Sequence, residues 1–311
     1  VANPATKVSL YSFTKAVADG TFHSVGITVV IALIGILFTG FLIIKNIRGN
    51  ILFGILGTWI LGMIAEASGL YIPDPKLGTF SVFPNLSAGL AAFIPLNPLP
   101  VWGKMDFSSV FSLDFFAVIF AFLFVDLFDT VGTLIGVAQE GNLLNEKGEL
   151  PRVGRALMSD ALGTCLGACL GTSTVTSYVE STTGVAEGGR TGLTALTSAI
   201  LFILAIPLYP IFLAIPSFAT APALVFVGLL MIKNVTKMDF DSDIADTVGG
   251  FVAIIFMPFA YSIATGIMFG ILTWVILKIV TGKIKEIHPI MWVAFALFAV
   301  RIVTLICGVS S

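Results

Sequence analysis

Two carboxylates stand inside a strongly apolar stretch of this chain. The run from Phe115 to Val137 is long enough to cross a bilayer as a helix, yet it contains Asp126 and Asp129. An Asp in hydrocarbon costs roughly 2.5–3.5 kcal/mol even on lenient insertion scales. Residues three positions apart share one face of a helix, so this face must look into protein or water. An intramembrane acid of this kind is typical of a functional site.

The composition favours a membrane protein. Hydrophobic residues make up 57% of the 311 residues, charged residues make up only 11%, and the mean hydropathy is +1.03. A soluble domain cannot bury that much apolar surface, so we predict an all-α polytopic membrane protein. The net charge of −2 argues against nucleic acid as a partner. Three cysteines and two histidines do not form a standard zinc set, and we expect neither a metal nor a cofactor.

Apolar runs of about 20 residues mark the expected membrane helices. When these spans alternate across the bilayer, and the stretch 172–190 completes a further crossing, the basic turns 45–48, 147–155, 233–237 and 278–285 fall on one side, which is cytoplasmic by the positive-inside rule. The last run carries Arg301 and either spans the bilayer or lies at its interface. The expected spans are Val25–Ile44, Ile51–Tyr71, Phe115–Val137, Ala156–Gly171, Thr191–Leu213, Ala219–Ile232, Ile244–Tyr261, Ala264–Val280 and Pro289–Ile306.

A polar stretch after the fourth of these spans predicts a broken helix. Five of the six residues 172–177 are Ser or Thr, and the β-branched threonines are poor helix formers. We expect an extended segment over 172–178, then a half-helix that starts near Glu180 and is capped by one of residues 181–183. Non-helical backbone at membrane depth is tolerated only where protein or a cavity covers it, and discontinuous helices build midplane sites in transporters. We therefore expect Asp126, Asp129, Tyr178 and Glu180 to line one cavity.

The span before this stretch carries its own polar and small residues. Gly163, Gly167 and Gly171 recur every four residues, which predicts that another helix packs closely on this face. Asp160 in the same span either partners polar groups of the core or lies near the membrane surface.

Other roles for the acids stay open at this point. Asp126, Asp129 and Glu180 would also fit groups that only pack the bundle, as in a non-transporting membrane scaffold. An intramembrane aspartyl protease uses two carboxylates that share a proton, but such acids face each other from different helices. Asp126 and Asp129 share one helix, which argues against an enzyme.

Several motifs resemble those of the xanthine/uracil permease family of nucleobase:cation symporters. The stretch 171–181 (GTSTVTSYVES), followed by 188–194 (GGRTGLT), is similar to the signature of the adenine, guanine and hypoxanthine branch. The runs 125–133 (VDLFDTVGT), 221–231 and 257–263 resemble that branch too. The resemblance extends along nearly the whole chain.

The resemblance implies a fold of two inverted seven-span repeats, in which a core domain holds the site and a gate domain moves against it. This chain would then be N-terminally truncated and would begin near the end of the fifth span. The implied divisions are the end of a preceding element (1–24), two gate-domain helices (25–71), an extracellular or periplasmic connection (72–112), core-domain helices with the substrate site (113–190), a core-domain helix and connection (191–218), gate-domain helices (219–281) and a C-terminal membrane or interfacial helix (282–311).

The resemblance also implies a function and a substrate site. It implies proton-coupled uptake of purine nucleobases (adenine, guanine, hypoxanthine) across the cell membrane, by a multi-pass protein that is able to form a homodimer. Asp129 resembles the acid that holds the edge of the base, Tyr178 the aromatic residue near it, and Glu180, flanked by Val179 and Ser181, the acid at the start of the broken helix. A carboxylate accepts two N–H donors of a base at once, and an aromatic face stacks on its ring.

The coupling ion is implied to be a proton or sodium. Asp126, Asp129 and Asp160 resemble acids of the family, and we expect proton coupling to involve these three. Desolvation and a like-charged neighbour both favour the protonated form of a carboxylate, and Asp126 and Asp129 are such neighbours. The nearest rival within transport is an anion carrier of similar architecture, but that function needs a cation in the site rather than three acids.

Overall fold

The computed structural model describes residues 12–85, 87, 93, 101–108, 113–146, 148–232, 235, 243–260 and 262–306. Within these ranges the chain is helical and contains no β-strand. Every expected span is helical, with bounds that shift by a few residues. The long helices are α2 (Ile27–Ile44), α3 (Asn50–Ala67), α4 (Leu113–Glu140), α5 (Val153–Leu170), α7 (Gly192–Ala205), α9 (Ser217–Ile232), α10 (Ile244–Ala260), α11 (Ile263–Val280) and α12 (Pro289–Ile306). Shorter helices are α1 (Phe13–Ala18), α6 (Ser181–Ala186) and α8 (Tyr209–Leu213).

The lengths and hydropathies of these helices are those of a multi-pass membrane protein. By length and composition, five helices of the described part are able to cross a membrane: Phe22–Ile44, Asn50–Ala67, Phe122–Glu140, Gly192–Leu213 and Ile263–Val280. Three further apolar helices are shorter: Ser217–Ile232, Ile244–Ala260 and Pro289–Val303. Lys147, Lys233, Lys237 and Tyr261, which belong to the expected turns and spans, lie outside the described residues.

Helices α2, α3 and α9 pack together through small residues. Thr39 and Thr58 are completely buried where α2 meets α3. Each lies against a glycine of the other helix, Thr39 against Gly54 and Thr58 against Gly35, so closely that a Cβ at either glycine would overlap the threonine. Each hydroxyl donates to a carbonyl of its own helix, at 2.8 Å to Gly35 and 2.7 Å to Gly54. The glycines therefore allow close backbone approach, and the buried hydroxyls of Thr39 and Thr58 both have an acceptor.

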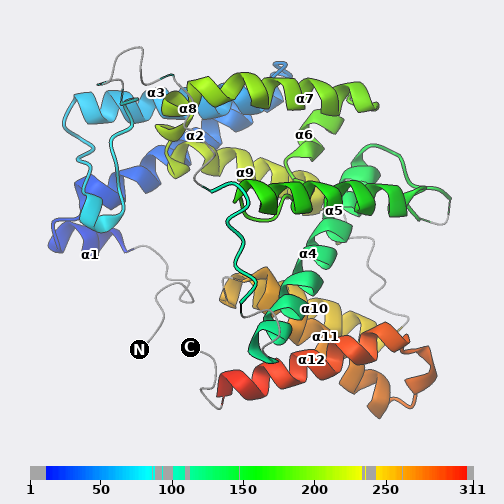
Figure 1. The fold of residues 1–311 in the computed structure, drawn as a ribbon. Coiled ribbons are helices and arrows are strands. Elements are labelled where there is room, and N and C mark those ends of the chain that lie inside the picture. The colour runs from blue at the N-terminus through cyan, green and yellow to red at the C-terminus, as the bar shows by residue number, and fades with distance from the viewer. Residues whose placement is uncertain are drawn as a thin grey trace.

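Helices α10, α11 and α12 form a second group. The pair α10–α11 is also close, because a Cβ at Gly270 would lie 2.7 Å from the Cβ of Ala253. Helix α4 runs obliquely from this group toward α5 and α6 (Figure 1). Its Phe124 is buried with residues of α11 and α12, and its ring centroid lies 5.6 Å from that of Phe298. Helix α4 thus connects the two groups and carries the paired acids between them.

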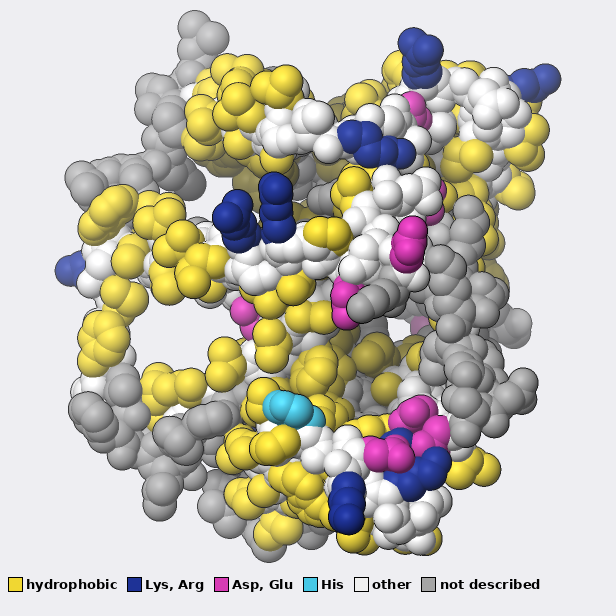
Figure 2. Space-filling view, turned by 90° about the vertical axis from the view of Figure 1, so that its right-hand side faces the viewer, with side chains coloured by type: hydrophobic (Ala, Val, Ile, Leu, Met, Phe, Trp, Pro, Cys, Tyr) yellow, Lys and Arg dark blue, Asp and Glu magenta, His cyan; other side chains and the backbone are white. Residues whose placement is uncertain are grey.

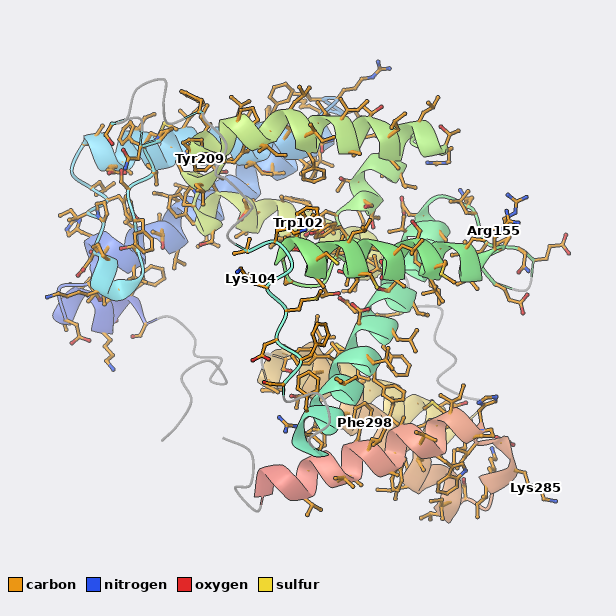
Figure 3. All side chains as sticks on the ribbon, viewed as in Figure 1. Trp102, Lys104, Arg155, Tyr209, Lys285 and Phe298 are labelled. Atoms are coloured by element: carbon orange, nitrogen blue, oxygen red, sulfur yellow. The ribbon has the colours of Figure 1, made fainter. Side chains whose placement is uncertain are left out.

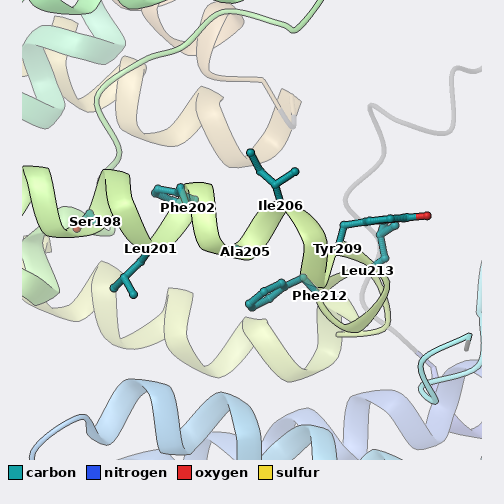
Figure 4. A pocket seen from close by; sticks show the side chains of 8 residues that line it. All are labelled: Ser198, Leu201, Phe202, Ala205, Ile206, Tyr209, Phe212 and Leu213. Carbon is teal, nitrogen blue, oxygen red and sulfur yellow. The ribbon is translucent and has the colours of Figure 1, made fainter. Parts of the chain in front are cut away.

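The expected span 191–213 is not one continuous helix. Helix α7 ends at Ala205, a 3-10 turn covers Ile206–Leu208, and α8 follows, because Pro207 and Pro210 have no N–H to donate. None of the residues of α7 is buried. One face of α7 and α8 lines an open, mostly apolar hollow of about 740 Å³, which Figure 4 shows with its lining residues Ser198, Leu201, Phe202, Ala205, Ile206, Tyr209, Phe212 and Leu213. Such a surface suits contact with lipid or with another membrane helix.

Two of the basic turns lie toward the same end of the molecule. In Figure 3, Arg155 and Lys285 lie toward one end of the molecule, and Tyr209 lies toward the other. Arg155 and Lys285 belong to two basic turns that the sequence places on the cytoplasmic side. The division into core and gate domains and the inverted repeat remain predictions.

Candidate functional site

The acidic face of α4 contacts the polar stretch that follows α5. Thr174 donates a 2.8 Å hydrogen bond to Oδ1 of Asp126. The hydroxyl of Thr174 also lies 3.1 Å from that of Thr164 on α5. Thr164 in turn donates to the carbonyl of Val175 at 2.9 Å. These bonds join α4, α5 and the segment 172–178, although Asp126 and Thr174 are 48 residues apart.

Asp160 joins the same three elements at a second point. Its Oδ2 accepts a hydrogen bond from Thr130 of α4 at 3.0 Å, and its Oδ1 accepts one from Ser177 at 2.9 Å. Asp160 is half-buried and Thr130 is buried. Of the two alternatives for Asp160, the structure shows that it partners polar groups of the core.

Asp129 is the acid with an unused acceptor capacity. It is half-buried, and in the part of the chain that the structure describes, no hydrogen bond reaches its carboxylate. Asp126 and Asp160 lie close enough for their charges to act on it. A half-buried carboxylate without a donor is costly, so a ligand with N–H groups would be bound favourably here.

The broken helix forms as predicted, with one correction. Residues 172–178 contain no helical turn, and α6 begins at Ser181 with Glu180 as its N-cap residue. The prediction that residues 181–183 cap this half-helix is wrong. Thr182 and Thr183 instead donate backward to the carbonyls of Val179 and Glu180, at 2.7 and 2.8 Å, because both residues already lie inside the first turn.

The predicted substrate residues follow directly after this segment. The side chains of Tyr178, Glu180 and Ser181 are exposed, and Val179 is half-buried. Helix α6 packs against α4 and α9, and Ser181 lines a cavity of about 520 Å³ that also includes Arg190. Another face of α6 lines a cavity of about 450 Å³ shared with α3 and α9. That Asp126, Asp129, Tyr178 and Glu180 line one cavity stays a prediction.

Among the described residues, no other helix packs on the glycines of α5, and the prediction of a close helix there is wrong. Gly171 ends α5 with a φ of +77°, which reverses the chain so that the following residues return along the same face. A Cβ at Gly167 would lie 2.8 Å from side-chain atoms of Thr172 and Val175. Val175 also lies next to Gly163. The small residues therefore admit the chain's own polar segment, which brings Thr174 and Ser177 to the acids.

A second polar cluster lies at the α10–α11 pair. Lys278 of α11 is only 3% exposed. Its Nζ lies 2.5 Å from Oδ2 of Asp243, 2.7 Å from Glu286 and 3.4 Å from Asp246, and Lys283 adds a 3.0 Å contact to Asp243. Figure 2 shows charged side chains of both signs gathered in one patch on this side of the molecule.

The sequence alone places Lys278 only in a basic turn. A signal was present, because Lys278 interrupts an apolar run while Asp243 and Asp246 stand at the start of the preceding span. The hydrogen bonds from Lys278 and Lys283, and one from the backbone N–H of Ala245, hold the pKa of Asp243 well below its usual range. This cluster fastens the ends of α10 and α11 and is separate from the three acids of the candidate site.

Comparisons with known proteins point to one family. A family model for xanthine/uracil permeases, described as a permease family, matches residues 5–269. A protein of Methanocaldococcus jannaschii named as a permease is 42% identical over 88% of this chain and 59% of its own length. The adenine permease AdeP of Escherichia coli is 35% identical over 97% of this chain and 61% of its own length. The guanine/hypoxanthine permease PbuG of Bacillus subtilis is 38% identical over 96% of this chain and 61% of its own length. The chain thus spans about three-fifths of the length of these relatives.

Proposed function

Since the chain belongs to the xanthine/uracil permease family, we propose that the full-length protein takes up purine nucleobases across the cell membrane in symport with protons. Relatives with 35–38% identity are named as adenine and guanine/hypoxanthine permeases, which supports a purine as the substrate. Transport is proposed for the whole protein because the relatives extend well beyond the part that this chain matches.

The observation that carries the proposal is the lack of a hydrogen-bond donor to the Asp129 carboxylate among the described residues. Its half-buried carboxylate faces no hydrogen-bond donor in the described part of the chain, while the neighbouring Asp126 and Asp160 each accept hydroxyl groups. A neutral purine presents N–H groups beside ring acceptors. Two N–H groups on one edge would satisfy Asp129 with charge-assisted bonds, which are about twice as strong as neutral ones.

The remaining residues have supporting roles in this proposal. Tyr178 supplies an aromatic face for the ring, and Glu180 a second acceptor at the start of α6. Asp126 is assigned the coupling proton because Asp129 is assigned to the base, and two like charges one turn apart on α4 disfavour ionisation of both. Its hydrogen bond from Thr174 connects the charge state of α4 to the segment that leads to Tyr178.

The alternatives fit the site less well. An anion would meet three acids, and among the described residues no Lys or Arg forms an ion pair with any of them. Proteolysis by two carboxylates requires that they share a proton across a gap, whereas Asp126 and Asp129 stand on one helix and Asp126 is bonded to Thr174.

Uptake measurements test the proposal. The full-length protein is expressed in cells that lack purine uptake, and radiolabelled adenine, guanine and hypoxanthine are followed between acidic and neutral pH with and without sodium. The proposal predicts saturable uptake that purines inhibit and that rises at acidic pH without sodium. Uptake that needs sodium at every pH would refute proton coupling, and uptake of no purine would refute the substrate class.

A further inference from the structure

We infer that Asp160 is a positioning residue that holds the broken helix against α4, and that it acts through Thr130 and Ser177. This inference rests on the proposed function, and it replaces the proton-coupling role that the family resemblance implies for Asp160. It also assigns roles to two hydroxyl residues, Thr130 and Ser177, which lie within the motifs 125–133 and 171–181 but had no role assigned there.

The first argument is the place of the two hydroxyls in the chain. Thr130 directly follows Asp129, and Ser177 directly precedes Tyr178. Both donate to the same carboxylate, one to each oxygen, at 3.0 and 2.9 Å. Asp160 therefore connects the neighbours of the two residues proposed to hold the base, and a change at Asp160 would move both.

The second argument is that Thr130, like Thr164, does not make the bond within its own helix that several other helical threonines make. Thr39, Thr58 and Thr197 each donate to the carbonyl four residues earlier in their own helix, which is the usual bond of a threonine in a helix. Thr130 instead donates across to α5. Thr130 is only 1% exposed, so its hydroxyl has no access to water. Its hydrogen bond therefore goes to Asp160.

The third argument concerns where the segment is held. Thr174 and Thr164 fasten its beginning to Asp126 and to α5. Ser177 fastens its end, next to Tyr178. Loss of the Ser177 bond should therefore displace Tyr178, while the beginning of the segment keeps its contacts. A displacement of about 1 Å in a binding group is enough to cost about a hundredfold in rate.

The chemistry of the carboxylate separates positioning from proton coupling. In Asp160→Asn the amide oxygen accepts from one hydroxyl and the amide N–H donates to the other, so both links persist without a titrating group. In Asp160→Leu both links are lost at similar volume. Thr130→Val removes one link and keeps the shape, and Thr130→Ser restores the hydroxyl. Thr197→Val is the matched control, because Thr197 bonds only its own helix.

The experiment combines uptake with hydrogen exchange in the full-length protein. We expect Asp160→Leu, Thr130→Val and Ser177→Ala to raise KM for hypoxanthine or adenine by about tenfold or more, because displaced binding residues would lose a charge-assisted bond to the base. Asp160→Asn should raise KM by only about threefold and keep the wild-type pH profile, since neutral bonds are weaker. Thr130→Ser should restore KM, and Vmax at equal membrane amount should change less than KM.

Backbone amide exchange of residues 172–181, followed by mass spectrometry, gives a readout that needs no transport. It should accelerate in Asp160→Leu and Ser177→Ala, and should match wild type in Asp160→Asn and Thr197→Val. A flat pH profile in Asp160→Asn would overturn the inference in favour of proton coupling, as would unchanged exchange in Asp160→Leu. If the wild-type protein takes up no purine, the proposed function fails, while the exchange data still decide the positioning role.

Discussion

Thr174 donates a 2.8 Å hydrogen bond to Asp126 and thereby joins the broken helix to the acidic face of α4. This bond connects a group proposed to bind protons with a segment proposed to present the base-binding residues. A hydroxyl is able to donate to a charged carboxylate and to accept from a protonated one, so the contact survives a change of charge at Asp126. The bond is therefore compatible with the coupling role proposed for Asp126, because the segment stays attached to α4 in either charge state.

Asp126→Asn should separate binding of the base from proton coupling. An amide keeps the shape and the link to Thr174 but does not titrate in this range. We expect equilibrium binding of hypoxanthine within about threefold of wild type, while the rise of uptake at acidic pH is lost. Binding assays and uptake between pH 5 and 8 in the full-length protein check this. A pH dependence like that of wild type would move the coupling proton to another group.

The α2–α3 crossing should not tolerate a side chain at Gly35. A Cβ there would overlap Thr58, and overpacking of this kind costs about 1–3 kcal/mol. We expect Gly35→Ala to lower the thermal unfolding midpoint in detergent, and Thr58→Ala to restore part of the loss. Gly228→Ala is the control, because a Cβ at Gly228 meets no atom within 4 Å. Equal midpoints for both alanine variants would show that this crossing is looser than the structure indicates.

Lys278→Met should loosen the α10–α11 pair. The change removes the cation that lies within 3.4 Å of Asp243, Glu286 and Asp246. Lys283 still contacts Asp243, but the carboxylates then outnumber the cations by more, which destabilises the folded state. We expect a lower unfolding midpoint and faster amide exchange at the start of α10. Lys285→Met provides the comparison, since Lys285 is exposed and makes no ion pair with the residues described here. The same midpoint in both variants would argue against a stabilising cluster.

The same cluster should make the stability of the protein depend on pH. Lys278 and then Lys283 hold the pKa of Asp243 below its unfolded value, which is about 3.9. A depressed carboxyl pKa contributes stability that is fully present above the unfolded pKa and is lost as the pH falls through the folded one. Unfolding midpoints measured from pH 7 down to pH 3 should fall at the acidic end. The Asp243→Asn variant should have a lower unfolding midpoint at pH 7, and its midpoint should fall less toward pH 3. Midpoints of wild type and variant that fall in parallel would contradict this account.

Much of the helical arrangement could be predicted, because the length and hydropathy of a membrane span are properties of one continuous stretch of sequence. The runs ending at Ile44 and Val280 are confirmed as helices with the same C-terminal residue. The break after Gly171 was also predictable, since β-branched hydroxyl residues disfavour a helix wherever they stand. The interruption at Pro207 was missed although its signal is local, because the average hydropathy of the run hides a proline.

Contacts between distant residues could not be predicted in the same way. The small residues of α5 indicate a close neighbour but do not identify it, and Val175 instead of another helix covers Gly163 and Gly167. Lys278 meets Asp243 across 35 residues, a pairing that depends on how α10 and α11 pack. For the candidate site, the acids were identifiable from their cost in lipid, whereas Thr130 and Ser177 carry no such cost and emerged only from the geometry.

The role of Asp129 is the most direct test of the account. Uptake of radiolabelled hypoxanthine and adenine is measured for the full-length wild type, Asp129→Asn and Glu180→Gln, at equal amounts in the membrane. Glu146→Gln, a change at an exposed acid outside the site, is the control. The account predicts that Asp129→Asn and Glu180→Gln each weaken substrate affinity by about tenfold to a hundredfold, with normal uptake by the control. Wild-type uptake in both variants would show instead that these acids only pack the bundle.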